Sequence, residues 1–263
     1  MSNIKPPSSS YTQFLTRLRL WIAIWIHVLA GVFTLLVFFP RFDTPNKELH
    51  IQRWSKHLLE IFGVELSVKN SDILPNNSYL LASNHISWLD IHAINSFKPI
   101  RFVAKSEVES WPIFGWMAKQ LGTVFIKRSS SRHAHVVVGE MSKALMAESI
   151  CIFPEGTSTN GEIVRPFKPN LFESAVIAHV PVYTLAIRYI CQKTGRRSDV
   201  AAFVGEMGLL ESMANILKNR NLVVELSFFP PAGSSPQQPN DRKWLALHSH
   251  EQISQYLARC NTE

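Results

Sequence analysis

The chain has 263 residues, of which 46% are hydrophobic and 18% charged, and 27 basic against 20 acidic residues give a net charge of +7. This balance favours anionic partners such as a lipid surface or an acidic substrate, and we find no zinc-finger spacing or aromatic RNA-binding signature that would indicate nucleic acid. Cys151, Cys191 and Cys260 are odd in number and widely spaced, which argues against a disulfide framework or a structural zinc site and fits a reducing compartment. No metal is expected.

The first long apolar segment runs from Leu20 to Phe39 and contains no charged side chain, with His27 as its one ionisable group. Twenty helical residues span about 30 Å, the thickness of a bilayer core, and the segment is too long for the core of a signal peptide. We therefore expect a membrane helix, with Trp21 and Trp25 as interfacial anchors near its start. Basic residues flank both ends, so the sequence leaves open its orientation and whether it spans the bilayer or enters at a slant.

The next segment, residues 47–62, carries apolar side chains at roughly helical spacing and a polar face with Arg53, Lys56 and His57. This helix could lie on anionic headgroups or pack on the body of the protein, and the sequence favours neither. Residues 1–63 are predicted to form a membrane-anchoring helical segment. Its two helices could make a hairpin that seats the protein on one leaflet.

From Val64 onward short strands alternate with helices, which is typical of an α/β domain. We expect this domain to cover residues 64–263 and find no second soluble domain. The strands are expected at residues 65–68, 79–82, 101–104, 123–126, 150–153, 182–187 and 222–228. The helices are expected at residues 89–96, 112–120, 133–147, 172–178 and 242–259.

A histidine and a carboxylate, His85 and Asp90, stand five positions apart directly after the strand expected at 79–82. On an uninterrupted helix five residues turn the chain by about 500°, so the two side chains would lie about 140° apart. A working pair needs a bend within the motif, and Ser83, Asn84 and Ser87 are competent N-caps for a helix that begins there. Asp90 could then accept the proton of one imidazole nitrogen and leave the other as a base.

Three more short motifs follow: GTVFIKR at residues 122–128, FPEGT at 153–157 and VPV at 180–182. In this order the set resembles the glycerolipid acyltransferases of the 1-acylglycerol-3-phosphate (PlsC) type, whose blocks are HX4D, GxxFIxR, FPEGT and VPV. The resemblance covers about residues 64–228 and implies an α/β fold with a mixed central sheet flanked by helices. HX4D alone is a weak signal, whereas all four blocks behind an N-terminal membrane segment are specific.

The resemblance implies that His85 is the catalytic base and that Asp90 orients it. The acceptor hydroxyl would attack an acyl thioester, either acyl-CoA or acyl carrier protein, with no cofactor and no covalent acyl-enzyme. Backbone amides near Ser87 or near residues 156–157 could stabilise the oxyanion, and the sequence does not choose between them. The residues expected to bind substrate are Gly122, Phe125, Arg128, Glu155, Gly156 and Thr157.

Within that set, the resemblance assigns Arg128 to the phosphate of the acceptor, a task that suits the fork of a guanidinium. Glu155 could orient an arginine, hold a glycerol hydroxyl or form a structural ion pair at the strand end. Gly122 could permit a tight entry to its strand or be a turn glycine.

The third block departs from the family pattern, because Ser158 and Thr159 follow FPEGT where the family commonly has an arginine and a serine. The change removes one candidate phosphate ligand, for which Arg165 or Lys168 could compensate. It also resembles the lyso-ornithine-lipid acyltransferase branch, whose acceptor has no phosphate.

We therefore expect acylation of 1-acylglycerol-3-phosphate to phosphatidic acid at a membrane surface. The alternative acceptors are lyso-ornithine lipid or another lyso-lipid, and the alternative of another class is a non-catalytic lipid-binding membrane protein. The expected partners are membrane lipids, a lyso-lipid and the acyl donor, and cytosolic donors place the active site on the cytoplasmic face of the inner membrane.

Overall fold

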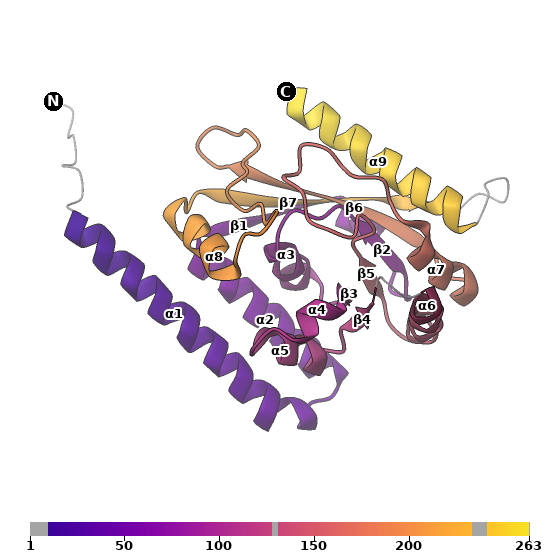
Figure 1. Cartoon of the computed structure of the whole chain (residues 1–263), viewed down its shortest axis with the longest axis horizontal. Coiled ribbons are helices and arrows are strands. Elements are labelled where there is room, and N and C mark those ends of the chain that lie inside the picture. Colours follow the sequence, from indigo (N-terminus) through magenta and orange to yellow (C-terminus); the bar gives the residue numbers. More distant parts are fainter. Residues whose placement is uncertain (1–9, 128–130, 233–240, 263) are drawn as a thin grey trace.

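A seven-stranded sheet forms the centre of the protein, in a computed structural model that describes residues 10–127, 131–232 and 241–262 (Figure 1). The strand order is β1-β7-β6-β2-β5-β3-β4. Every neighbouring pair is parallel except β6 and β7, which run antiparallel, so the sheet is mixed. The strands are β1 (Val64–Lys69), β2 (Leu80–Ser83), β3 (Arg101–Lys105), β4 (Val124–Ile126), β5 (Ile150–Ile152), β6 (Val182–Cys191) and β7 (Leu222–Ala232).

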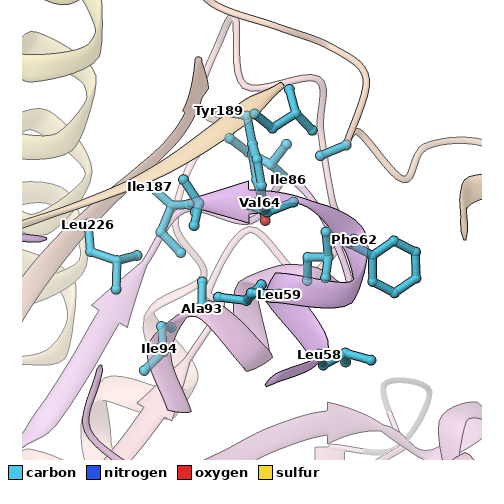
Figure 2. Packing of buried hydrophobic residues seen from close by; sticks show 14 of the residues in the cluster. Leu58, Leu59, Phe62, Val64, Ile86, Ala93, Ile94, Ile187, Tyr189 and Leu226 are labelled. Atoms are coloured by element: carbon cyan, nitrogen blue, oxygen red, sulfur yellow. The ribbon is translucent and has the colours of Figure 1, made fainter. Parts of the chain in front are cut away.

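Helices cover both faces of this sheet, and a hydrophobic core lies under each layer. The helices are α1 (Ser10–Val37), α2 (Thr44–Phe62), α3 (Leu89–Phe97), α4 (Ser106–Glu109), α5 (Phe114–Gln120), α6 (Ser131–Leu145), α7 (Glu173–Ala178), α8 (Leu209–Lys218) and α9 (Arg242–Thr262). One core joins α1, α2, α3 and α8 to the sheet, and the other joins α6, α7 and α9 to its opposite face. Figure 2 shows the first core, where side chains of α2 and α3 meet those of β6 and β7.

The N-terminal helix α1 lies along α2, to which a 3₁₀ turn at Phe39–Arg41 connects it (Figure 1). On the inner face the Trp54 indole donates to the His27 carbonyl oxygen at 3.2 Å, and His27 Nε2 lies 3.0 Å from the Trp54 carbonyl oxygen. The outer face is apolar and exposed, with Phe14, Leu18, Ile22, Ile26, Leu29, Phe33 and Leu36. In the described part of the chain, α1 is the one helix long and apolar enough to cross a membrane.

The alternation of strands and helices that the sequence predicts is confirmed, with differences at the ends of elements. Strands β6 and β7 run longer than expected because the last residues of each pair with the first residues of the other. The prediction missed the short α4 and also α8, whose cap Gly208 offers no side-chain signal for a helix start. The segment at 47–62 packs on the body as α2, while Arg53, Lys56 and His57 remain exposed.

Candidate active site

The imidazole of His85 and the carboxylate of Asp90 form a close pair, with Nδ1 and Oδ2 2.8 Å apart. The bend that this pair requires is present, because β2 ends at Ser83 and α3 begins only at Leu89. Asp90 has no exposed surface, whereas 21% of the His85 side chain is exposed. A buried carboxylate therefore fixes one nitrogen of a ring that substrate can reach.

Asp90 also organises the bend itself. Its Oδ2 accepts from the backbone amides of Ile86 at 2.7 Å and Ser87 at 3.0 Å. Both amides belong to the bend before α3, whose own N-cap residue, Trp88, provides no side-chain cap. Of the expected caps, Ser87 makes a bond of this kind, a long 3.3 Å contact from the Leu89 amide to its hydroxyl oxygen.

The other two expected caps, Ser83 and Asn84, point to β6 instead, so this part of the prediction was wrong. The Asn84 side chain donates to the Ile187 carbonyl oxygen at 2.9 Å and accepts from the Ile187 amide at 2.8 Å. The Ser83 hydroxyl donates to the carbonyl oxygen of Leu185 at 3.0 Å. Asn84 thus extends the contact between β2 and β6 past their last paired residues, Ser83 and Leu185, through its side chain. Asn84, the residue before His85, is therefore hydrogen-bonded to a strand in the middle of the sheet.

The plane of the His85 ring is set by Phe153, the first residue of the FPEGT motif. The two rings stack with centroids 4.1 Å apart and planes 16° apart, and Phe102 on β3 stacks behind Phe153 at 6.0 Å. With Nδ1 held by Asp90, no described residue bonds the other nitrogen, Nε2. The ring therefore presents one free nitrogen beside an apolar wall.

Glu155 holds the backbone of the segment that carries His85. Its Oε1 accepts from the His85 amide at 2.7 Å and its Oε2 from the Arg165 amide at 2.8 Å, and only 4% of the residue is exposed. Burial raises the pKa of the Glu155 carboxyl, against the lowering effect of its bonds to the Arg165 and His85 amides. From the same loop, the Thr159 amide donates to the His85 carbonyl oxygen at 2.9 Å.

The backbone amides expected to stabilise an oxyanion differ in what they already bind. The Ser87 amide is taken by Asp90, and the amide of Gly156, which has a φ of +77°, donates to the Phe153 carbonyl oxygen at 3.0 Å. Among the described residues we find no partner for the Thr157 amide. The amide of Trp88, next to Ser87, likewise has no partner among them, so both alternatives that the sequence left open remain.

Two further predicted site residues, Gly122 and Phe125, lie farther along the sheet. Gly122, with a φ of +76°, turns the chain into β4, and the half-buried Phe125 is on that edge strand, separated from β5 by β3. Arg128 lies outside the described residues. Arg165 and Lys168 have exposed side chains.

The sequence analysis gave Phe153 no role of its own and treated Asn84 only as a possible helix cap. It did not single out Tyr189, whose hydroxyl donates to Asp90 Oδ1 at 2.8 Å. Phe153 belongs to the FPEGT motif and Asn84 directly precedes the motif histidine, a signal that could have found their roles. Tyr189 belongs to no motif and meets Asp90 only through the fold.

Comparison with known proteins identifies the relatives of this chain. The family model described as Acyltransferase matches residues 65–188. A lyso-ornithine lipid O-acyltransferase of Pseudomonas aeruginosa is 32% identical over 211 residues, which cover 80% of this chain and 79% of the relative. A 1-acyl-sn-glycerol-3-phosphate acyltransferase of Neisseria gonorrhoeae is 35% identical over 183 residues, which cover 69% of this chain and 70% of the relative.

A similar solved structure is the crystal structure of the 1-acyl-sn-glycerophosphate (LPA) acyltransferase PlsC from Thermotoga maritima. It superposes with a TM-score of 0.66 at 21% identity and covers 95% of this chain and 96% of its own. The two proteins share their fold.

Proposed function

This chain belongs to the acyltransferase family and is an acyltransferase, and we propose that it acylates 1-acylglycerol-3-phosphate to give phosphatidic acid. The observation that carries the proposal is the 2.8 Å contact between His85 Nδ1 and the buried Asp90 carboxylate. A base needs one nitrogen held and the other open to the substrate hydroxyl, and His85 meets both conditions.

In the proposed reaction His85 Nε2 takes the proton of the lyso-lipid hydroxyl, and the oxygen attacks the carbonyl carbon of an acyl thioester. A carbon–oxygen bond forms, the carbon–sulfur bond breaks, and the imidazolium returns its proton to the leaving thiolate. Asp90 stabilises the imidazolium, and the Thr157 amide is our candidate donor to the oxyanion. The thioester is acyl-CoA or acyl carrier protein, and general-base assistance of this kind contributes about 10²–10⁴-fold.

We assign the headgroup of the acceptor to Arg128, because the planar guanidinium can bind two phosphate oxygens at once. Gly122, just before β4, and Phe125, on β4, precede it in the sequence and would form the adjoining wall. Glu155 has both oxygens bonded to backbone amides, which supports a role in positioning His85 over direct contact with the acceptor. Gly156 would then serve by turning the chain tightly after it.

A second acceptor, lyso-ornithine lipid, is favoured by one specific observation. Where the phosphatidic-acid enzymes commonly have an arginine, this chain has Ser158, whose hydroxyl bonds the Phe203 carbonyl oxygen. The position therefore offers no cation to a phosphate, and an acceptor without phosphate needs none. The Pseudomonas aeruginosa relative acts on lyso-ornithine lipid, as its name states.

The substrates are lipids, and we propose that residues 1–63 anchor the acyltransferase domain, residues 64–263, to the membrane. The exposed apolar face of α1 supports this role, because it would bury its side chains in lipid. Cytosolic acyl donors would place the active site on the cytoplasmic face.

The test offers the purified enzyme both lyso-lipids, each with acyl-CoA and with acyl carrier protein, and identifies the lipid formed by mass spectrometry. Phosphatidic acid from 1-acylglycerol-3-phosphate is the expected product, with His85→Ala as the inactive control. Formation of acylated ornithine lipid alone would establish the second acceptor. Binding of lyso-lipid without consumption of any thioester would contradict an enzymatic role and indicate a lipid-binding protein.

A further inference from the structure

The Asp90 carboxylate is fully buried, and both of its oxygens have partners. Three of the four donors come from its own segment and share Oδ2: the His85 ring and the amides of Ile86 and Ser87. The fourth is the Tyr189 hydroxyl, which donates to Oδ1 at 2.8 Å. In the described part of the chain, Tyr189 is the one partner of Oδ1, and it lies 99 positions away in the sequence.

Tyr189 comes from the middle of the sheet, on β6, which pairs with β2 on one side and β7 on the other. Only 1% of it is exposed, and Figure 2 shows its ring standing in the core beside Ile86. A buried phenol needs a hydrogen-bond partner, and this one has Asp90. Burial raises the pKa of Tyr189 well above its usual range, and the charge of Asp90 raises it further, so the hydroxyl keeps its proton and remains a donor.

We propose that Tyr189 is a positioning residue of the acyl-transfer reaction. Its hydroxyl fixes the Asp90 carboxylate so that Oδ2 points at His85, and it stabilises part of the negative charge of that carboxylate. The inference rests on the proposed function and deepens it. Without the hydroxyl, Oδ1 would be a buried acceptor with no partner, a costly state. The carboxylate could then rotate, and it would also hold the proton of the His85 ring more tightly, because less of its charge would be taken by another donor.

Two other ionisable groups interact with this pair among the described residues. Cys151 on β5 lies in the field of Asp90, and burial together with that charge raises the pKa of its thiol well above the usual range. Glu155 lies in the fields of both His85 and Asp90. Neither group bonds to the Asp90 carboxylate. Removal of the Tyr189 hydroxyl therefore takes away one bond of that carboxylate, together with the contact between this hydroxyl and the Ser87 side chain.

The test measures kcat and both KM values of Tyr189→Phe across the pH range, with Tyr183→Phe as the matched control. Tyr183 lies on the same strand and faces the same core, but it makes no bond to Asp90. We expect kcat of Tyr189→Phe to fall about ten- to a hundredfold, the range for loss of a hydrogen bond to a charged group. Both KM values should stay unchanged, and the acidic limb of kcat should move to higher pH.

The control should keep the kcat and the pH profile of the wild type. Replacement of Tyr189 by fluorotyrosine keeps the ring and strengthens the donor, so it should move the acidic limb to lower pH even if Tyr189→Phe does not fold. Wild-type behaviour in both Tyr189 variants would overturn the proposal, as would an equal loss in Tyr183→Phe. If the wild type forms no diacyl lipid, the proposed function fails and this inference fails with it.

Discussion

Glu155 Oε1 accepts a hydrogen bond from the His85 backbone amide at 2.7 Å, across 70 positions of sequence. The same carboxylate accepts from the Arg165 amide at 2.8 Å. The loop after β5 and the turn after β2 are therefore joined at the residue that carries the imidazole, so this carboxylate controls where the ring stands.

We expect Glu155→Gln to lower both stability and kcat. Glutamine has one acceptor oxygen where glutamate has two, so the amide of either His85 or Arg165 loses its partner. An unpaired buried amide costs about 1–3 kcal/mol, and the resulting shift of His85 should lower kcat and leave the KM for the acceptor unchanged. Unfolding and steady-state kinetics check this, with the exposed Glu206→Gln as control. A raised acceptor KM at unchanged stability would instead indicate direct contact with substrate.

Asn84→Ala should destabilise the fold more than replacement of an exposed asparagine. It removes the acceptor of the Ile187 amide and the donor to the Ile187 carbonyl oxygen, both inside the sheet. Two unpaired buried groups cost about 2–6 kcal/mol together. Thermal unfolding in detergent will measure the loss against Asn76→Ala, which changes an exposed turn residue. Equal melting temperatures for the two variants would show that the Asn84 side chain contributes nothing to the sheet.

How far the site could be predicted depends on how local each interaction is. His85 and Asp90 lie five positions apart, so their pairing and the bend between them could be inferred from the motif. Glu155 was found as a motif residue, but its partners are backbone amides. Every residue other than proline has such an amide, so the sequence could not show which ones Glu155 binds. Tyr189 meets Asp90 only because β6 lies beside β2, a neighbourhood that the sheet topology sets.

The positions of the strands were easier to predict than their lengths. Each appears as a short apolar run, which a single sequence displays directly. The extra residues of β6 form strand because they pair with β7, and those of β7 because they pair with β6. This pairing links segments far apart in the chain. The orientation of Ser83 and Asn84 was missed for the same reason, since their partners lie on β6.

His92 should make the protein less stable in acid. It lies near Trp54 and Trp88, its Nδ1 is buried without a described partner, and burial, with a smaller effect of His27, lowers the pKa of His92 to about 3. The unfolded chain takes up this proton near pH 6.5 and the folded chain does not. Stability is therefore complete above about pH 6.5 and falls on acidification towards pH 3, by at most about 1.4 kcal/mol per unit.

The check for His92 is the pH dependence of the melting temperature. His92→Phe removes the titrating group and keeps a ring between the two tryptophans, so its melting temperature should fall less steeply in acid than that of the wild type. His179→Asn, an exposed position with a φ of 54° that asparagine tolerates, should follow the wild type. Identical slopes for His92→Phe and wild type would refute the buried neutral state.

Arg128→Ala should weaken the phosphate-bearing acceptor far more than the acyl donor. Loss of a charge-assisted bond to phosphate corresponds to about a ten- to hundredfold rise in KM for 1-acylglycerol-3-phosphate, with the KM for the thioester nearly unchanged. Lys127→Ala, which removes the neighbouring exposed cation, is the control for general electrostatic attraction. Equal losses for acceptor and donor would reject the assignment of Arg128 to the phosphate.

The central claim is that His85, held by Asp90, removes the proton from a lipid hydroxyl. The most direct test is the kcat of purified, folded His85→Ala, measured as diacyl lipid formed per enzyme. We expect a loss of at least about 10²–10⁴-fold, with a comparable loss in Asp90→Asn. Turnover near that of the wild type in His85→Ala would show that another group, or none, acts as the base.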